Sequence, residues 1–287
     1  MAQSPAHRFG QFIGELLEEM VRAPLEKIAA KHGLYLDYKH PRPARGNKRK
    51  VAWTDLKGNQ HDLDFVLEFG GSETTIGSPK AFIESAWRRY TKHSRNKAQE
   101  IQGAVSVLAE TYSKFNPFLG VILAGVFTKG SIQELRSHGF SIVYCQYEIV
   151  MEAFNHVGID ARFDENSPDD IVLAKVTACQ LLSTTDRNRI VRKLTSLVKS
   201  ELKTFVEDLE KCLNRQIERI LIASLHGPTI EVNDIAQAIE RITNYDETKP
   251  ADGFVRYEID IRYSNNDHIN GTFEDKLRAI QFLNHIV

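Results

Sequence analysis

The stretch AFIESAWRRYTKHSRNK, residues 81–97, joins an apolar strand pattern that holds one acid, Glu84, to a dense run of cations. A carboxylate in such a strand, between Ile83 and Trp87, needs a partner because burying an unpaired charge is costly. The run that follows contains no acid, and its basic side chains indicate contact with a polyanion. These side chains are Arg88, Arg89, Lys92, His93, Arg95 and Lys97.

The rest of the chain does not share this local excess of positive charge. Its 287 residues include 37 Lys and Arg against 38 Asp and Glu, which gives a net charge of -1. Any contact with a polyanion must therefore come from local clusters of cations. A hydrophobic content of 42% and a charged content of 26% are typical of a soluble globular protein.

Several classes of protein are not indicated. The three cysteines form no CxxC pair and no zinc spacing, which predicts a reduced, cytoplasmic protein. No apolar run is long enough to cross a bilayer, and the first residues lack a signal-peptide pattern, so no membrane partner is expected. Neither a Walker A motif nor a Gly-x-Gly-x-x-Gly loop is present, so no nucleotide cofactor is expected.

The first half of the chain has the element order of an α/β domain. Apolar residues at helical spacing predict a first helix that Gly33 ends. The patterns that follow predict strands at 50–55, 62–69 and 80–90, a helix at 94–112, a strand at 118–127, a short helix at 131–138 and a strand at 140–147.

A basic loop, HPRPARGNKRK at residues 40–50, lies between the first helix and the first predicted strand. Its prolines and glycine predict a loop, and its five cations make it a candidate polyanion contact. Arg45, Lys48 and Arg49 are the residues expected to bind. An ordinary exposed charged loop explains the same pattern, and both interpretations are open.

The second half predicts a mostly helical region. Residues 186–224 show one helical pattern without Gly or Pro, as in a long helix that packs along a partner. A helix at 232–242, strands at 255–263 and 268–273 and a final helix at 273–286 follow. We expect an α/β core over residues 1–165 and, over 166–287, a helical region that ends in a β-hairpin and a helix.

Two acids lie on neighbouring predicted strands, Asp64 on the second and Glu84 on the third. If these strands pair as a hairpin, both carboxylates project from one face near the same end. Carboxylate oxygens with open positions for water and phosphate suit Mg²⁺. The sequence therefore indicates a magnesium site, with the basic run beside it.

This pattern resembles the PD-(D/E)xK nuclease superfamily, in particular type II restriction endonucleases. His61–Val66 is similar to the segment that carries the metal-binding Asp, here Asp64, and Phe82–Ala86 to the hydrophobic-Glu-x-Lys segment with Glu84. A Gly-x-x-x-Glu on the first helix implies an extra metal ligand at Glu18. The resemblance implies a mixed sheet flanked by helices, Mg²⁺, cleavage of double-stranded DNA and a homodimer.

One position departs from the family. Ala86 stands where Lys is expected, and a methyl group cannot orient water or stabilise an oxyanion. Three explanations are open: a cation from Arg88, Lys92 or Lys97 fills the role, the site is naturally without catalysis, or the chain is an inactive Lys-to-Ala form. The expected function is a Mg²⁺-dependent endonuclease, and the alternative is a non-catalytic DNA-binding protein with the same fold.

Overall fold

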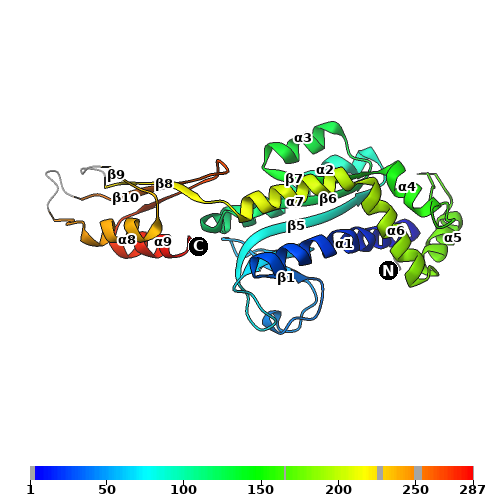
Figure 1. Cartoon of the computed structure of the whole chain (residues 1–287). Helices are drawn as coiled ribbons and strands as arrows, with labels where there is room; N and C mark the ends of the chain where they lie inside the picture. The colour runs from blue at the N-terminus through cyan, green and yellow to red at the C-terminus, as the bar shows by residue number, and fades with distance from the viewer. Residues whose placement is uncertain (1–3, 165, 225–228, 249–253, 287) are drawn as a thin grey trace. The chain divides into compact units, whose positions relative to one another are not determined.

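A computed structural model of the chain describes residues 4–164, 166–224, 229–248 and 254–286, with the backbone alone at 91–94 (Figure 1). The chain forms two compact units. The first holds Met1–Thr111 and Phe118–Glu210, and the second holds Tyr112–Pro117 and Lys211–Val287. The boundary expected after residue 165 thus falls inside the first unit.

The first unit is built on a five-stranded mixed sheet in the order β1-β4-β5-β6-β7. Its strands are β1 (Leu34–Tyr38), β4 (Phe65–Phe69), β5 (Ser78–Arg88), β6 (Phe118–Gly125) and β7 (Phe140–Gln146). β4 pairs antiparallel with β1 and β5, whereas β6 pairs parallel with β5 and β7. The apolar runs predicted as strands at 118–127 and 140–147 are confirmed as β6 and β7.

Helices flank the sheet on both faces (Figure 1). They are α1 (Pro5–His32), α2 (Thr91–Thr111), α3 (Lys129–Ser137), α4 (Tyr147–Asn155), α5 (Asp169–Gln180), α6 (Thr184–Leu197) and α7 (Lys199–Leu213). The Phe9 ring of α1 meets Trp87 of β5 edge-on, 6.2 Å between centroids. Because side chains alternate across a strand, Glu84 and Ala86 lie on the opposite face, where α2 packs on β5. The predicted α/β architecture of a mixed sheet between helices is confirmed.

The first helix forms as its sequence predicts. Ser4 caps α1, its Oγ accepting from the backbone N–H of His7 at 3.3 Å, and Gly33 ends the helix at φ 63° in the left-handed region. The apolar stripe around Leu16 and Leu17 is fully buried. Burial of this stripe fixes the rotation of α1, so Glu18, the next residue, lies at the border of the buried face.

The predicted strands of residues 50–69 need correction. The first strand of the main sheet is Leu34–Tyr38, whereas β2 (Val51–Thr54) pairs with β3 (Gln60–Leu63) in a separate two-stranded sheet. The single strand predicted at 62–69 is broken at Asp64 into β3 and β4. Asp64 lies between β3 of the two-stranded sheet and β4 of the main sheet, and its carboxylate accepts a hydrogen bond from the backbone of Ser85 in β5.

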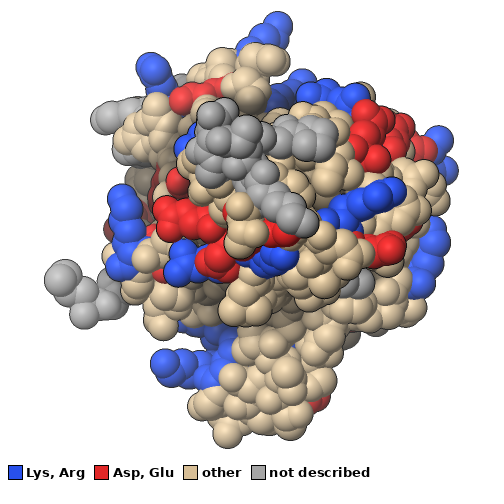
Figure 2. All heavy atoms as spheres, turned by 90° about the vertical axis from the view of Figure 1, so that its left-hand side faces the viewer, with Lys and Arg blue, Asp and Glu red and all other residues tan. Residues whose placement is uncertain are grey.

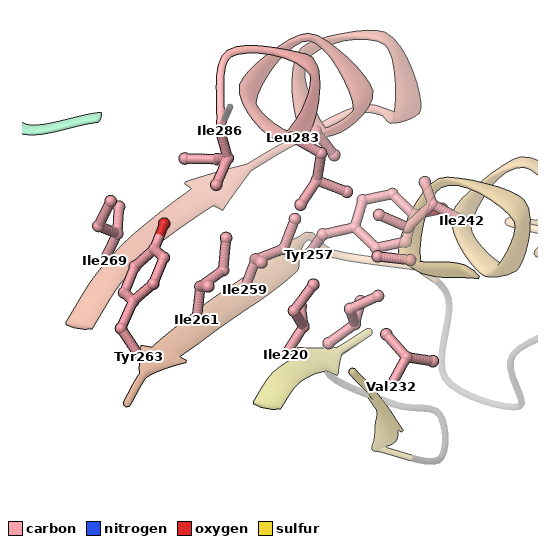
Figure 3. Packing of buried hydrophobic residues seen from close by; sticks show 13 residues of the cluster. Ile220, Val232, Ile242, Tyr257, Ile259, Ile261, Tyr263, Ile269, Leu283 and Ile286 are labelled. Atoms are coloured by element: carbon pink, nitrogen blue, oxygen red, sulfur yellow. The ribbon is translucent and has the colours of Figure 1, made fainter. Parts of the chain in front are cut away.

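The second unit is a four-stranded antiparallel sheet in the order β11-β10-β8-β9 with two helices. Its elements are β8 (Ile217–Ala223), β9 (Ile230–Val232), α8 (Ile235–Asn244), β10 (Tyr257–Tyr263), β11 (His268–Phe273) and α9 (Lys276–Asn284). The core lies between the sheet and the helices, where Ile220, Ile259 and Ile261 meet Ile242 and Leu283 (Figure 3). The predicted hairpin and final helix are confirmed as β10, β11 and α9.

The single long helix predicted at 186–224 is wrong. The helical pattern bends at Val198, which separates α6 from α7, and ends at Leu213. The isoleucine-rich run after it forms β8, since β-branched residues suit a half-buried strand. Arg215 fixes the change of direction by donating to the carbonyls of Phe115 at 2.6 Å and Asn116 at 2.8 Å. Among the described residues no helix is both long and apolar enough to cross a membrane.

Candidate active site

The two predicted acids, Asp64 and Glu84, come close together where β4 begins beside the central strand β5. β4 pairs antiparallel with β5 from Phe65, which lies opposite Ile83, and Asp64 is the residue just before β4. The backbone N–H of Ser85 donates to the Asp64 carboxylate, so this carboxylate meets β5 next to Glu84. The hairpin expected from the sequence therefore forms where it was predicted.

Ser85 holds the Asp64 carboxylate in place. The backbone N–H of Ser85 donates to Asp64 Oδ2 at 2.7 Å, and its hydroxyl donates to the same oxygen at 2.6 Å. The second oxygen, Oδ1, makes no hydrogen bond with any residue that the structure describes. Sequence patterns did not single out Ser85, because a serine one residue after the acid of a strand carries no signal of its own.

The carboxylates at this site are held in a poorly hydrated environment. Burial raises the pKa of Glu84 well above its usual range, and the negative charge of Asp64 raises it further. Burial also raises the pKa of Asp64, against the hydrogen bonds from Ser85. Clustered acids of this kind favour protons or a metal ion at neutral pH, because both remove the cost of neighbouring buried charges.

Glu18 approaches Asp64 from α1, which packs on the face of the sheet opposite Glu84. Burial and then the charge of Asp64 raise its pKa from 4.5 to about 7. Carboxylate oxygens from Asp64, Glu84 and Glu18 are ligands that Mg²⁺ prefers. In their present arrangement, however, no three His, Cys, Asp or Glu side chains within the described residues are placed to hold one metal ion.

Lys97 is the cation that approaches both strand acids. It projects from α2, on the sheet face of Glu84 and Ala86, and its charge lowers the pKa values of Asp64 and Glu84 against the larger effect of burial. Its side chain is 19% exposed, and its Nζ lies 2.7 Å from Glu100 Oε1. The position of Ala86 itself is buried, so a methyl group faces α2 there.

Several of the cations predicted to bind DNA are held within the protein instead. Arg89 lies with its guanidinium carbon 3.3 Å from the ring centroid of Phe163. Arg88 is half-buried and donates to the Trp87 carbonyl at 2.8 Å. Of the remaining cations in the basic run, Arg95 is exposed, and the side chains of Lys92 and His93 lie outside the described part.

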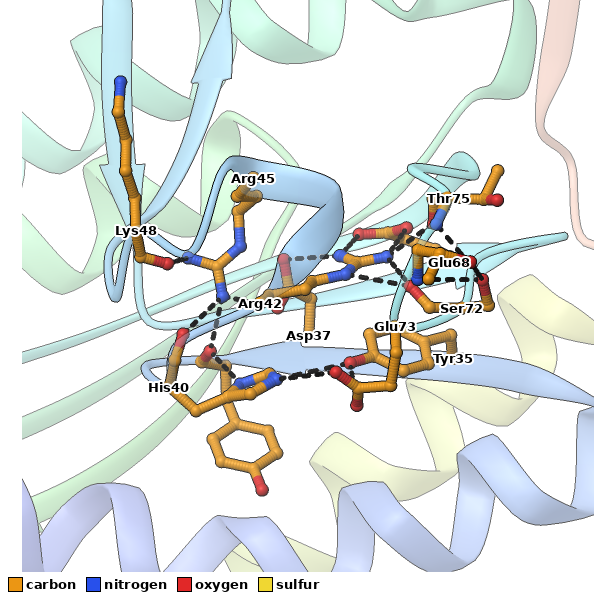
Figure 4. A network of polar contacts seen from close by, with 12 residues as sticks. Tyr35, Asp37, His40, Arg42, Arg45, Lys48, Glu68, Ser72, Glu73 and Thr75 are labelled. Atoms are coloured by element: carbon orange, nitrogen blue, oxygen red, sulfur yellow. Dashed lines mark hydrogen bonds and ion pairs between the residues drawn. The ribbon is translucent and has the colours of Figure 1, made fainter.

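The loop at residues 40–50 contains a buried ion network that the sequence did not predict (Figure 4). The fully buried Arg42 makes a bidentate pair with Glu68 at 2.7 and 2.9 Å and lies 2.7 Å from Asp37 Oδ2, close enough for an ion pair but not aligned as a hydrogen bond. Arg42 also donates to the carbonyls of Ser72 and Thr75 at 2.7 Å each. Asp37, Arg42 and Glu68 are among the few buried charged residues of the described chain.

Arg45, which the sequence predicts to bind DNA, belongs to this network. Its guanidinium donates to Asp37 at 3.0 Å and to the carbonyls of His40 and Lys48 at 3.0 and 2.9 Å. Such a group is occupied by the protein and is not available to a phosphate. The neighbouring side chains of Lys48 and Arg49 are exposed, as expected.

A cavity of about 230 Å³ opens beside Glu18. It is lined by Glu15, Glu18, Glu19, Arg22, Tyr38, Lys39, Arg49, Phe65 and Arg187. On the face drawn in Figure 2, lysine and arginine are interspersed with acids. Any selective polyanion contact must therefore depend on local sets of cations such as this one.

No family model matches the chain, and no curated protein matches it significantly. A solved structure titled "Crystal Structure of Protein of Unknown Function AF1548" is similar over 64% of this chain and 99% of its own, at 10% sequence identity and a TM-score of 0.27. A likeness at this level carries no information about function.

Proposed function

We propose that this protein is a Mg²⁺-dependent endonuclease that hydrolyses phosphodiester bonds of double-stranded DNA. The observation that supports this most is the closeness of two poorly hydrated acids, Asp64 just before β4 and Glu84 on β5, with Asp64 held to β5 by the backbone N–H of Ser85. The order of a helix, three antiparallel strands, a helix and a parallel strand also agrees with the PD-(D/E)xK core that the sequence resembles.

In this proposal Asp64 and Glu84 hold the metal ion, and Glu18 supplies a further carboxylate. When bound, Mg²⁺ would polarise the scissile phosphate and lower the pKa of a bound water. Ser85 orients Asp64, which reduces the freedom lost on binding the ion. The homodimer expected from the resemblance stays a prediction.

Lys97 takes the role that Ala86 cannot fill. Its ammonium group comes from α2 to the sheet face where a lysine at position 86 would project. There it stabilises the negative charge that develops on the phosphate during attack by water. Removing one such preorganised charge typically lowers the rate by about 10²- to 10³-fold.

The test is Mg²⁺-dependent nicking of supercoiled plasmid by the full chain and by Asp64→Asn. We expect the variant to lose cleavage while it still binds labelled duplex DNA in Ca²⁺. Asp170→Asn, an exposed acid on α5, is the matched control and should cut like the original chain. If Asp64→Asn cuts as fast as the control, the nuclease activity does not reside at this site.

A non-catalytic DNA-binding protein is the second candidate, and Ala86 is the observation that favours it. In that case the chain would bind duplex DNA with a marked salt dependence but leave plasmid intact with Mg²⁺ or Mn²⁺. Absence of both binding and cleavage would contradict both candidates.

A further inference from the structure

The cavity beside Glu18 has more free cations than free acids. Arg187 Nη2 lies 3.0 Å from Glu15 Oε2 and 2.7 Å from Glu19 Oε1, so one guanidinium neutralises part of the charge of two acids. Arg22 lies over the Tyr38 ring, with 3.8 Å from its guanidinium carbon to the centroid, and 3.7 Å from Glu26. Four lining side chains are thus occupied by their neighbours.

Lys39 and Arg49 are different, because neither makes a hydrogen bond or an ion pair with any residue that the structure describes. Both are exposed at the wall of the cavity. The charge of Lys39 acts on both Glu18 and Asp64, lowering their pKa values against the effect of burial. Lys39 thus shares the cavity wall with Glu18, the predicted extra ligand on α1.

The buried network fixes the loop that carries these two cations. Arg45 gathers the carbonyls of Tyr38, His40 and Lys48, so it holds together residues before and after Lys39 and just before Arg49 (Figure 4). Arg42 ties the same loop to Glu68 of β4, the strand that follows Asp64. A loop held in this way presents its cations at low entropic cost, since their backbone is already ordered.

We propose that Lys39 and Arg49 form a phosphate clamp that binds the DNA backbone at the cavity beside Glu18, on the side of Asp64 that faces α1. The clamp rests on the proposed function, because it takes the substrate to be DNA. The clamp places the phosphate contacts on the loop between β1 and β2 rather than on the basic run after Glu84. Arg42 and Arg45 act as positioning residues, and Lys39 and Arg49 touch the ligand.

The test measures binding of a labelled 20-base-pair DNA duplex in Ca²⁺ across a series of salt concentrations. The variants are Lys39→Gln, Arg49→Gln and the double change, with Lys129→Gln, an exposed cation on α3, as the matched control. Each clamp variant should weaken binding several-fold and reduce the log–log salt slope by about one, since each neutralised phosphate releases about one counterion. The control should change neither quantity, and circular dichroism should show all variants folded.

Plasmid cleavage with Mg²⁺ is measured in parallel for the unaltered chain, the clamp variants and Asp64→Asn. If the chain cuts, Asp64→Asn does not, and the clamp variants bind like the control, the clamp is overturned while the proposed function stands. If the clamp variants bind more weakly but no protein cuts DNA, the clamp is supported and the catalytic proposal fails. If the unaltered chain does not bind DNA, both are overturned.

Discussion

Replacing Glu18 by Gln should stabilise the first unit at pH 8 and leave it almost unchanged at pH 4. Burial and the charge of Asp64 raise the pKa of Glu18 from 4.5 to about 7. Below pH 4.5 the carboxyl is protonated in both the folded and the unfolded chain, so it has little effect on the free energy of unfolding. Between pH 4.5 and 7 the unfolded chain ionises first, and above pH 7 the folded state bears the full cost.

The size of this cost follows from the shift in pKa. At 1.36 kcal/mol per pKa unit the full effect would be about 3 kcal/mol. Because Glu18 is partly exposed, solvent screening reduces the expected value to about 1–2 kcal/mol. For a unit of this size, that corresponds to an increase in melting temperature of roughly 2–8 °C in the Gln variant at pH 8.

Tryptophan fluorescence is the appropriate assay, because both tryptophans, Trp53 and Trp87, belong to the first unit. Urea or thermal unfolding would be followed at pH 4 and pH 8, with Glu110→Gln, an exposed acid of α2, as the control. Mg²⁺ should stabilise the original chain more at pH 8 than at pH 5, since it competes with protons for the same oxygens. Equal stability of the Gln variant and the control at pH 8 would refute the proposed burial of charge at Glu18.

Two further predictions concern Lys97 and Arg42. Lys97→Met should slow plasmid cleavage by about 10²- to 10³-fold. Adding Ala86→Lys to this variant should recover part of the rate. A double variant that cuts no faster than Lys97→Met would contradict the proposal that Lys97 supplies the charge expected from a lysine at position 86. Arg42→Met should lower the free energy of unfolding by about 3–5 kcal/mol, because it leaves Asp37 and Glu68 buried with too little positive charge, whereas Lys129→Met should have little effect. Urea unfolding followed by tryptophan fluorescence measures this free energy of unfolding. A loss for Arg42→Met no larger than that for Lys129→Met would contradict the prediction.

Helices and strands were predicted correctly from the sequence where the residue pattern of one segment was enough to determine its secondary structure. The helical spacing before Gly33 and the apolar runs of β6 and β7 required no information from elsewhere in the chain. The antiparallel pairing of β4 with β5 was also predictable, because consecutive strands joined by one loop often form a hairpin. Local periodicity and connection length were sufficient in these cases.

The errors arose where distant residues decide the structure. The alternation around Asp64 continues without a break in the sequence, and only the hydrogen bonds from Ser85 show why β3 ends there. Likewise, Arg215 ends the long helical pattern through carbonyls about a hundred residues away in the chain. Arg45 resembled any exposed cation of a basic loop until its partner Asp37 was known.

The ion pairs of the first unit suggest why a nearly neutral protein sets a single acid, Glu84, beside many cations. Arg42 and Arg45 neutralise Asp37 and Glu68 in the interior, and Arg187 is shared by Glu15 and Glu19. What remains is a set of poorly hydrated acids, Asp64, Glu84 and Glu18, and two exposed cations, Lys39 and Arg49, that line the cavity together with Glu18. The acids lower stability, since their burial raises their pKa values more than the nearby cations lower them, whereas the exposed cations stay hydrated. Proteins retain features of this kind mainly at functional sites. A metal ion on the acids and a phosphate on the cations would complete both sets at once, which is the state that the proposed DNA complex supplies.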